Sequence, residues 1–312
     1  MRTSRTPGGT AAPDSAPRAI AGAVWTALGL VYVVWGSTYL AIRIVVQTMP
    51  PFLSAGARFI AAGLLLLGLV VRRYGAGALR ATRGQVGSAA VVGLLLLLGG
   101  NGLVVLAETS VPSGLAALLI AAVPMWLVVL RTATGDRPPP RTLGGVLLGF
   151  GGLAVLTVPG ISGEVRLSGV VLVVVASVLW SLGSFSASKL SLPDNAFTGS
   201  GYQMLAGGAG GILAGLVRGE HHAVDWAAYS TASWLALGYL VVFGSVVAFT
   251  AYAWLLQSAP LSLVATYAYV NPVVAVALGA LILDEALTVP ILVGGAIVVV
   301  AVSVIVGTER RQ

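Results

Sequence analysis

Two ionisable side chains lie inside or beside long apolar runs, where charge is costly. Arg58 follows a Pro-Pro pair by about two helical turns, and Glu108 comes just after the apolar run 86–106. An ionisable residue within a membrane-spanning helix costs roughly 2.5–3.5 kcal/mol to insert and is a functional candidate by default. We expect Arg58 and Glu108 to form an ion pair that a substrate or a proton could break. The alternative is that the Arg58 side chain snorkels to the lipid headgroups.

Polar and aromatic side chains within apolar runs are further candidates for lining a polar pathway. They are Asn101, Gln203, Tyr252, Thr266, Tyr269 and Asn271. Thr266 and Tyr269 share a helical face, whereas Tyr267 and Tyr269 point about 200° apart, so we expect only the Thr266–Tyr269 face to reach a cavity. Packing in the core is the alternative for the aromatic residues. Asn101 could instead cap a helix break or hydrogen-bond across helices.

The sequence offers little for catalysis, metal binding or cofactor binding. It contains no cysteine, and its two histidines, His221 and His222, are adjacent in a polar stretch typical of a surface turn. A serine-type intramembrane enzyme would need a base near the serine, and other transfer chemistry would need clustered carboxylates or histidines. No Walker-type sequence occurs, and the glycine runs lack a strand–turn–helix context. We therefore expect no cofactor and no metal, and keep an intramembrane enzyme only as an alternative.

The elements that must position these residues are membrane-spanning helices. Of 312 residues, 57% are hydrophobic and 9% are charged, against roughly 25% charged in a soluble domain. A span needs about 20 mostly apolar residues. Ten segments qualify: 20–42, 52–71, 86–106, 113–132, 143–158, 168–188, 198–217, 232–255, 261–283 and 289–307. The chain is thus predicted to be an all-α polytopic membrane protein with the lipid bilayer as its surroundings.

The basic residues predict the orientation of these segments. Residues 1–19 and 308–312 are predicted to be tails, the first of them disordered because it is rich in Pro, Gly, Ser and Arg. With both tails in the cytoplasm, the inner loops and tails hold 13 Lys and Arg residues and the outer loops hold three, as the positive-inside rule requires. Topology explains the net charge of +7, so no nucleic-acid partner is needed.

A repeated pattern divides the chain into two halves, 20–158 and 168–307. SVPSGLAALLIAAVP (110–124) and SAPLSLVATYAYVNP (258–272) share Ser, Pro, Leu, Ala and Pro at positions shifted by 148. Trp35 and Trp180 open similar stretches 145 residues apart. Five helices per half place the second copy upside down in the membrane. The arginines after the fourth segment, which are absent after the ninth, agree with this inversion.

One proline lies near the middle of each repeated segment. Pro124 and Pro272 are each about 11 residues into their segments, near 16 Å deep in a hydrocarbon core about 30 Å thick. A proline removes a backbone donor and frees a carbonyl, which is costly in lipid unless it faces protein or a wet cavity. Paired midplane breaks in inverted halves point to a transport site. A packing kink is the ordinary alternative.

Motifs in both halves resemble a known family. WGSTYLAIRI, PPFLSAGARF and GNGLVVLAETSVPSGLAALLIAAVP in the first half, with LWSLGSFSASKL, GYLVVFGSVVAFTAYAWLL and ATYAYVNPVVAVALGALILDEALT in the second, are similar to EamA-type permeases of the drug/metabolite transporter superfamily. The resemblance implies an inverted five-plus-five helix fold around a central cavity in a bacterial inner membrane. It also implies that Trp35, Ser37 and Tyr39 face the pathway, with Trp180 at the repeat-related place. An interfacial aromatic belt is the alternative for the two tryptophans. Glu108 departs from the basic or aromatic residue that many relatives carry there.

These observations favour a secondary transporter that exports or exchanges small metabolites, amino acids or drug-like compounds by alternating access. Cargo is expected to bind at the membrane midplane between the halves, near Pro124 and Pro272. Proton antiport and facilitated diffusion both remain open, as does a passive channel. The sequence does not fix the cargo or the oligomeric state, although a monomer would suffice.

Overall fold

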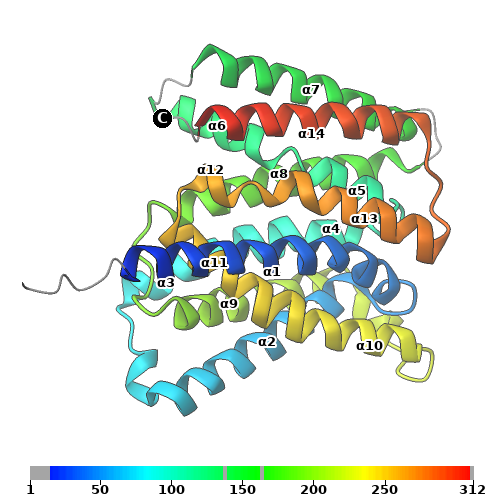
Figure 1. Cartoon of the computed structure of the whole chain (residues 1–312). Coiled ribbons are helices and arrows are strands. Elements are labelled where there is room, and N and C mark those ends of the chain that lie inside the picture. Colours follow the sequence, from blue (N-terminus) through cyan, green and yellow to red (C-terminus); the bar gives the residue numbers. More distant parts are fainter. Residues whose placement is uncertain (1–14, 136–138, 162–164, 310–312) are drawn as a thin grey trace, which may run out of the picture.

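The fold is a bundle of helices that run roughly parallel to one direction. The computed structural model describes residues 15–135, 139–161 and 165–309, and side chains at 15–21, 157–161, 261, 262, 269, 306 and 309 are not included. These described residues contain no β-strand. The start of α1 and the end of α14 lie on the same side of the bundle, at the left of Figure 1.

The first half of the chain supplies five long helical segments. They are α1 (Ser15–Val45); α2 (Pro51–Tyr74); α3 (Arg83–Gly93), which continues through η2 (Leu94–Gly102) into α4 (Leu103–Ala107); α5 (Ser113–Ile120) followed by α6 (Val123–Ala133); and α7 (Pro140–Ile161). A short 3-10 helix, η1 (Ala76–Leu79), joins α2 to α3. Apolar runs of this length form helices because in lipid every backbone polar group must be satisfied within the segment.

The second half repeats this order. Its segments are α8 (Leu167–Ala187); α9 (Ala196–Val217), followed by η3 (Glu220–Ala223); α10 (Thr231–Tyr239), which continues through η4 (Leu240–Val247) into α11 (Ala248–Ser258); α12 (Leu261–Val264) and α13 (Tyr267–Leu283); and α14 (Val289–Glu309). Six described helices are long and apolar enough to cross a membrane, and three shorter apolar helices accompany them. Each of the ten predicted segments coincides with helical structure.

The structure differs from two predicted boundaries and from one predicted helix break. Helix α1 begins at Ser15, inside the predicted tail 1–19, and α14 extends to Glu309, past the predicted start of the C-terminal tail. The fourth segment breaks at 121–122, directly before Pro124, which is the second residue of α6. In the ninth segment, however, Pro272 lies inside the continuous helix α13, and the break comes earlier, at 265–266. The two breaks are therefore not equivalent.

Both halves contain a π-helical stretch in their third segment. Leu94–Gly102 (η2) and Leu240–Val247 (η4) start 146 residues apart, which is close to the repeat offset. π-helical turns are rare and occur frequently at functional sites because they widen the helix and redirect side chains. Neither stretch is predicted from the apolar pattern.

Two pairs of helices from opposite halves pack closely. Helix α2 packs on α9, and α7 packs on α14, the latter pair lying together at the top of Figure 1. A methyl group on Gly56 would lie 2.6 Å from the backbone nitrogen of Ile212, and one on Gly208 would lie 2.8 Å from that of Ile60. Only glycine allows this approach, so the two halves are held at a fixed crossing point near the N-terminal end of α2.

Candidate functional site

A small cavity lies between the two halves of the chain. Its lining comes from α1, α2, η2, α4, α5, α8, η4, α11 and α13. The lining residues are Trp35, Thr38, Tyr39, Ile42, Arg58, Phe59, Leu97, Gly100, Asn101, Val104, Ile120, Trp180, Gly244, Phe249, Tyr267 and Asn271. Its volume is about 50 Å³, which is space for a few water molecules and too little for a metabolite. The site as it stands therefore has no room for a metabolite.

Four aromatic rings pack together on one side of this cavity. Trp35 and Trp180 meet edge to face with ring centroids 5.4 Å apart, and Tyr267 meets Trp35 in the same way at 5.4 Å. The ring of Tyr252 lies 4.8 Å from Trp35 and 5.7 Å from Trp180. Both tryptophans are more than nine-tenths buried. They are thus part of the centre of the bundle and do not form an interfacial belt.

Each of these tryptophans contacts the π-helical stretch of the opposite half. The indole N–H of Trp35 donates a hydrogen bond to the Gly244 carbonyl in η4, at 3.2 Å. Trp180 lies against Gly100 in η2, where an added methyl group would be 2.6 Å from its ring. The two π-helical stretches and the two tryptophans therefore form one two-fold arrangement at the interface between the halves.

Arg58 is the charged residue of the cavity lining. It is 4% exposed, and its Nε donates to the Ser245 hydroxyl of η4 at 2.9 Å. The guanidinium lies over the ring of Phe59, 4.7 Å from the centroid, while Nη1 is buried without a hydrogen-bond partner. A methyl group on Gly244 would lie 3.0 Å from Nη2, so glycine at this position makes room for the guanidinium. Arg58 does not snorkel to the membrane surface.

Three further polar groups of the lining lack hydrogen-bond partners. They are Oδ1 of Asn101, Oδ1 of Asn271 and the hydroxyl of Tyr267. Buried polar groups are nearly always hydrogen-bonded, so each unsatisfied one needs an explanation. Together with Nη1 of Arg58 they give a mostly apolar lining four polar atoms that are free to bind a ligand.

Four further predicted site residues, Ser37, Thr266, Tyr252 and Gln203, lie outside the cavity lining. Ser37 bonds to the Tyr239 hydroxyl at 2.6 Å, and Thr266 bonds to the Tyr32 hydroxyl. Tyr252 stands behind the lining and bonds to the Ser184 hydroxyl at 2.7 Å. The side chain of Gln203 is buried where α9 packs on α3. The side chain of Tyr269 is outside the part of the chain that the structure describes.

Comparison with known proteins gives the family. The model of the EamA-like transporter family matches residues 22–158 and again residues 167–307. The chain belongs to the EamA-like transporter family. Its fold class is accordingly that of a ten-helix membrane protein with an internal repeat.

Individual relatives of this EamA-like chain agree with that assignment. The uncharacterized inner membrane transporter YedA of Escherichia coli K12 is 40% identical over 256 residues, covering 81% of this chain and 80% of the relative. The probable amino-acid metabolite efflux pump of the same organism is 27% identical over 52% of each chain. A crystal structure with 21% identity superimposes with a TM-score of 0.65 over 94% of this chain and 99% of the other, which shows the fold alone.

The expected ion pair between Arg58 and Glu108 is not formed in this EamA-like protein. Glu108 is fully buried, and neither of its carboxyl oxygens has a hydrogen-bond partner. Arg43 of α1 instead donates to the Glu108 backbone carbonyl. The prediction was wrong because Arg58 lies on the face of α2 that meets η4, where it bonds to Ser245.

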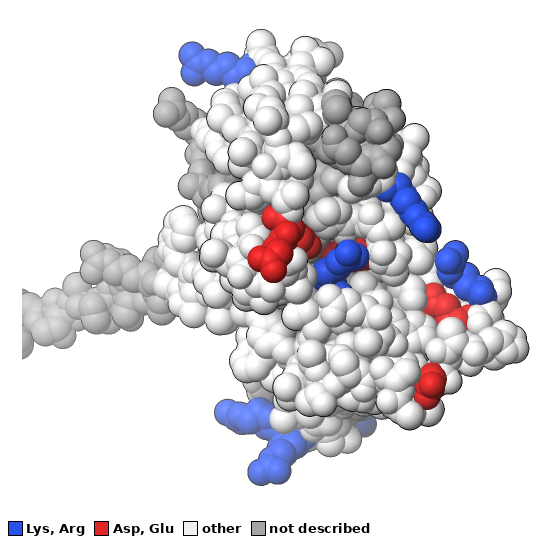
Figure 2. Space-filling view, turned by 90° about the vertical axis from the view of Figure 1, so that its right-hand side faces the viewer, with Lys and Arg blue, Asp and Glu red and all other residues white. Residues whose placement is uncertain are grey.

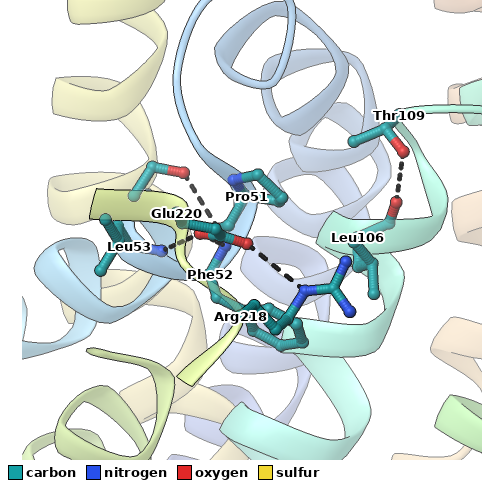
Figure 3. A network of polar contacts seen from close by, with 8 residues as sticks. Pro51, Phe52, Leu53, Leu106, Thr109, Arg218 and Glu220 are labelled. Atoms are coloured by element: carbon teal, nitrogen blue, oxygen red, sulfur yellow. Dashed lines mark hydrogen bonds and ion pairs between the residues drawn. The ribbon is translucent and has the colours of Figure 1, made fainter. Parts of the chain in front are cut away.

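Two carboxylates of the second half cap helices of the first half. Helices α2 and α5 begin after Pro50 and Pro112, and neither proline offers a side-chain cap. Glu220 accepts from the backbone N–H groups of Phe52 at 2.9 Å and Leu53 at 3.0 Å (Figure 3).

Glu285 caps α5 in the same way. It accepts from the N–H groups of Ser113 at 2.8 Å and Gly114 at 3.1 Å, and from the Ser113 hydroxyl at 2.9 Å. A negative charge at a helix N-terminus also interacts favourably with the helix dipole. Each capping contact therefore joins the two halves.

A shared local motif aims both glutamates. Each follows a residue in the left-handed conformation at the end of a helix: Gly219 (φ 77°) before Glu220 and Asp284 (φ 52°) before Glu285. At the second site, the backbone N–H groups of Asp284 and Glu285 both bond back to the Gly279 carbonyl, the latter at 3.2 Å. Such a turn reverses the chain at the helix end, which brings the next side chain back across the bundle.

These contacts lie on the face opposite the described chain ends. We call this side, formed by residues 46–50, 108–112, 218–230 and 284–288, the outer face. Figure 2 shows it with few charged side chains, a basic one standing near the centre between acidic ones. The two caps therefore join the halves on this face.

Proposed function

We propose that this chain is a secondary-active transporter that exports or exchanges small carboxylates across a bacterial inner membrane. The cargo binds in the cavity between the two halves, and its carboxylate is held by Arg58. The observation that carries this proposal is the buried Arg58 guanidinium, whose Nη1 has no hydrogen-bond partner.

A buried charge without a counter-charge is strongly unfavourable, so a site that keeps one is suited to a ligand that neutralises it. The cavity lining contains no acidic residue. The planar guanidinium matches the geometry of a carboxylate, to which it donates two parallel hydrogen bonds. The missing counter-charge is therefore supplied by the cargo.

The other lining groups suit the rest of such a cargo. Amide oxygens of Asn101 and Asn271 accept hydrogen bonds, as an ammonium group requires. The rings of Trp35, Trp180 and Tyr267 offer an apolar and cation-attracting wall. An amino acid with an apolar or aromatic side chain fits this combination, which is in keeping with the name of the amino-acid metabolite efflux pump among the relatives.

In an alternating-access mechanism, the cavity widens when one face of the protein opens, which gives the cargo the space that this small cavity lacks. A volume of about 50 Å³ means that the halves must separate on one face before cargo enters. The arginine and lysine distribution favours both termini in the cytoplasm, so the capped outer face would face away from it. Export is the direction that the relative's name supports.

Matched pairs of compounds test this function. Purified protein in proteoliposomes is assayed with L-phenylalanine against L-phenylalanine amide, and with indole-3-acetate against indole-3-acetamide. We expect flux of at least one carboxylate, with its amide competing at least tenfold more weakly, because a neutral amide leaves Arg58 without a counter-charge. Arg58→Gln should abolish this flux and Arg58→Lys should reduce it.

Arg73→Gln is the matched control, since Arg73 is an exposed arginine at the other end of the same helix. It should leave the flux unchanged. Equal competition by acid and amide, or full activity in Arg58→Gln, would contradict the assignment of the carboxylate to Arg58.

A further inference from the structure

We propose that the Glu108 carboxyl is a proton-binding site and that the outer face closes only when it is protonated. This inference rests on the proposed alternation between open and closed outer faces. It adds a coupling ion to that function, because one proton from the outer solution then accompanies each closure.

In this structure, no hydrogen bond stabilises an ionised Glu108. Its side chain is fully buried, and neither carboxyl oxygen accepts a hydrogen bond. Burying a carboxylate without hydrogen bonds or a paired cation is far more costly than burying the neutral acid. The two other glutamates of this face differ, since the carboxylates of Glu220 and Glu285 accept backbone N–H groups.

The groups that face Glu108 do not provide a counter-ion at hydrogen-bond distance. Arg43 is the basic one, but it donates to the backbone carbonyl of Glu108 and leaves the carboxyl oxygens without a partner. Glu285 is a second carboxylate within electrostatic range of Glu108, and the Tyr39 hydroxyl also interacts with Glu108. Glu108 lies one residue beyond the membrane-spanning segment that ends at Ala107. Burial raises the pKa of its carboxyl well above the ordinary value. Glu285 raises this pKa further, and Arg43 lowers it.

Opening of the outer face would hydrate Glu108 and return its pKa toward the ordinary glutamate value of about 4.3. A group whose pKa is higher in the closed form favours that form at low pH. This contribution is complete below the ordinary pKa and is lost as pH rises toward the raised one. Between the two values the closed-to-open ratio falls by up to tenfold per pH unit. The proton moves from outer water to a Glu108 oxygen on closing and returns on reopening.

The location of Glu108 links this proton to the Glu285 cap and to the cavity. Glu285 holds α5 through three hydrogen bonds, and an ionised Glu108 would repel it. Tyr39, which interacts electrostatically with Glu108, lines the cavity. Ionisation of Glu108 therefore weakens the cap that closes the face directly above the cargo site.

Because the chain has no cysteine, one introduced thiol reports on a single position. Ile42 is 2% exposed and lines the cavity, so Ile42→Cys reacts with a membrane-impermeant methanethiosulfonate from outside only when the outer face opens. The labelling rate is measured in spheroplasts between pH 5.5 and 8. Rates are divided by those of Ala227→Cys on the exposed outer loop, which corrects for ionisation of the thiol.

We expect the corrected rate for Ile42→Cys to rise at least tenfold across this range. Adding Glu108→Gln, a neutral side chain of the same shape, should leave a slow rate at every pH. Adding Arg43→Gln should move the transition to higher pH, since Arg43 favours ionisation of Glu108. This second variant keeps the test informative if Glu108→Gln is poorly produced.

Two results would overturn the inference: a corrected rate that is independent of pH, or the same pH transition in Glu108→Gln. Either would leave the transport function intact. A cysteine at position 42 that is never labelled from outside would instead count against an outward-open state and hence against the proposed function.

Discussion

Helices α2 and α9 occupy equivalent places in the two halves and pack on each other, yet their first turns are capped differently. Helix α2 begins on the outer face, where its free N–H groups bond to Glu220 of the other half. Helix α9 begins on the opposite face, where Asn195 of its own half accepts from Phe197 and Thr198. One cap crosses between the halves and the other does not.

The contacts between halves near the start of α9 are of a different kind. The hydroxyls of Thr198 and Tyr202 donate to the carbonyls of Ala78 and Leu79, at 2.8 and 2.6 Å. These are bonds between neutral groups, which are roughly half as strong as charge-assisted ones. Among the described residues, the outer face has carboxylate caps between the halves in addition to neutral bonds such as that of Thr48 to Ser233, whereas the contacts here are neutral. We therefore expect separation of the outer face to have the higher cost.

Removing the Glu285 cap should break this asymmetry most strongly. Glu285→Ala deletes three hydrogen bonds at the start of α5. Because bonds to charged groups contribute about 1.5–3 kcal/mol each when buried and Glu285 is partly exposed, we expect a combined loss of about 2 kcal/mol. External labelling of Ile42→Cys should then accelerate roughly 30-fold. Asp225→Ala, on an exposed outer loop, is the control. An equal labelling rate in both variants would show that the Glu285 cap does not hold the outer face closed.

Removing the Glu220 cap should have a smaller effect. Glu220→Ala deletes two backbone hydrogen bonds, and we expect a loss of about 1 kcal/mol, or roughly fivefold faster labelling. Arg218→Gln tests the neighbouring ion pair, whose atoms are 3.8 Å apart and whose arginine is 53% exposed. Exposed pairs of this kind contribute little, so this variant should stay within about twofold of the parent. The account fails here if Arg218→Gln has the larger effect.

Asn195→Ala sharpens the comparison from the other side. Loss of an N-cap costs about 1 kcal/mol of helix stability, so the melting temperature in detergent should fall. Labelling from outside should not change, because this cap lies within one half. Faster outer labelling in this variant would mean that the two caps do not differ as proposed.

The positions of the helices along the chain could be predicted from the sequence. Which side chains of the broken ninth segment face the cavity could not. Apolar runs of spanning length form helices because their backbone groups must be satisfied within the segment, and Pro124 indicates the start of α6. The ninth segment instead breaks at 265–266 and restarts at Tyr267. A break in a helix changes which residues face a given direction. Thr266, which was expected to face the cavity, therefore does not line it, and Tyr267 does.

The site was also set by features that an apolar pattern does not encode. The π-helical stretches η2 and η4 read as ordinary helix, although the small pair Gly244–Ser245 in the middle of η4 is a signal in retrospect. The capping contacts could have been anticipated from the sequence more easily. Pro50 and Pro112 precede helices without any Ser, Thr, Asp or Asn at the cap position, so their amides required partners from elsewhere in the chain.

The claim that one site alternates between the two faces is tested most directly by counterflow. Proteoliposomes preloaded with unlabelled L-phenylalanine, or with indole-3-acetate if that is the transported probe, are diluted into the labelled compound. The account predicts that preloading accelerates uptake of label in the parent protein and not in Arg58→Gln. Uptake by the parent that is the same with and without preloading would show a pore and would contradict a carrier.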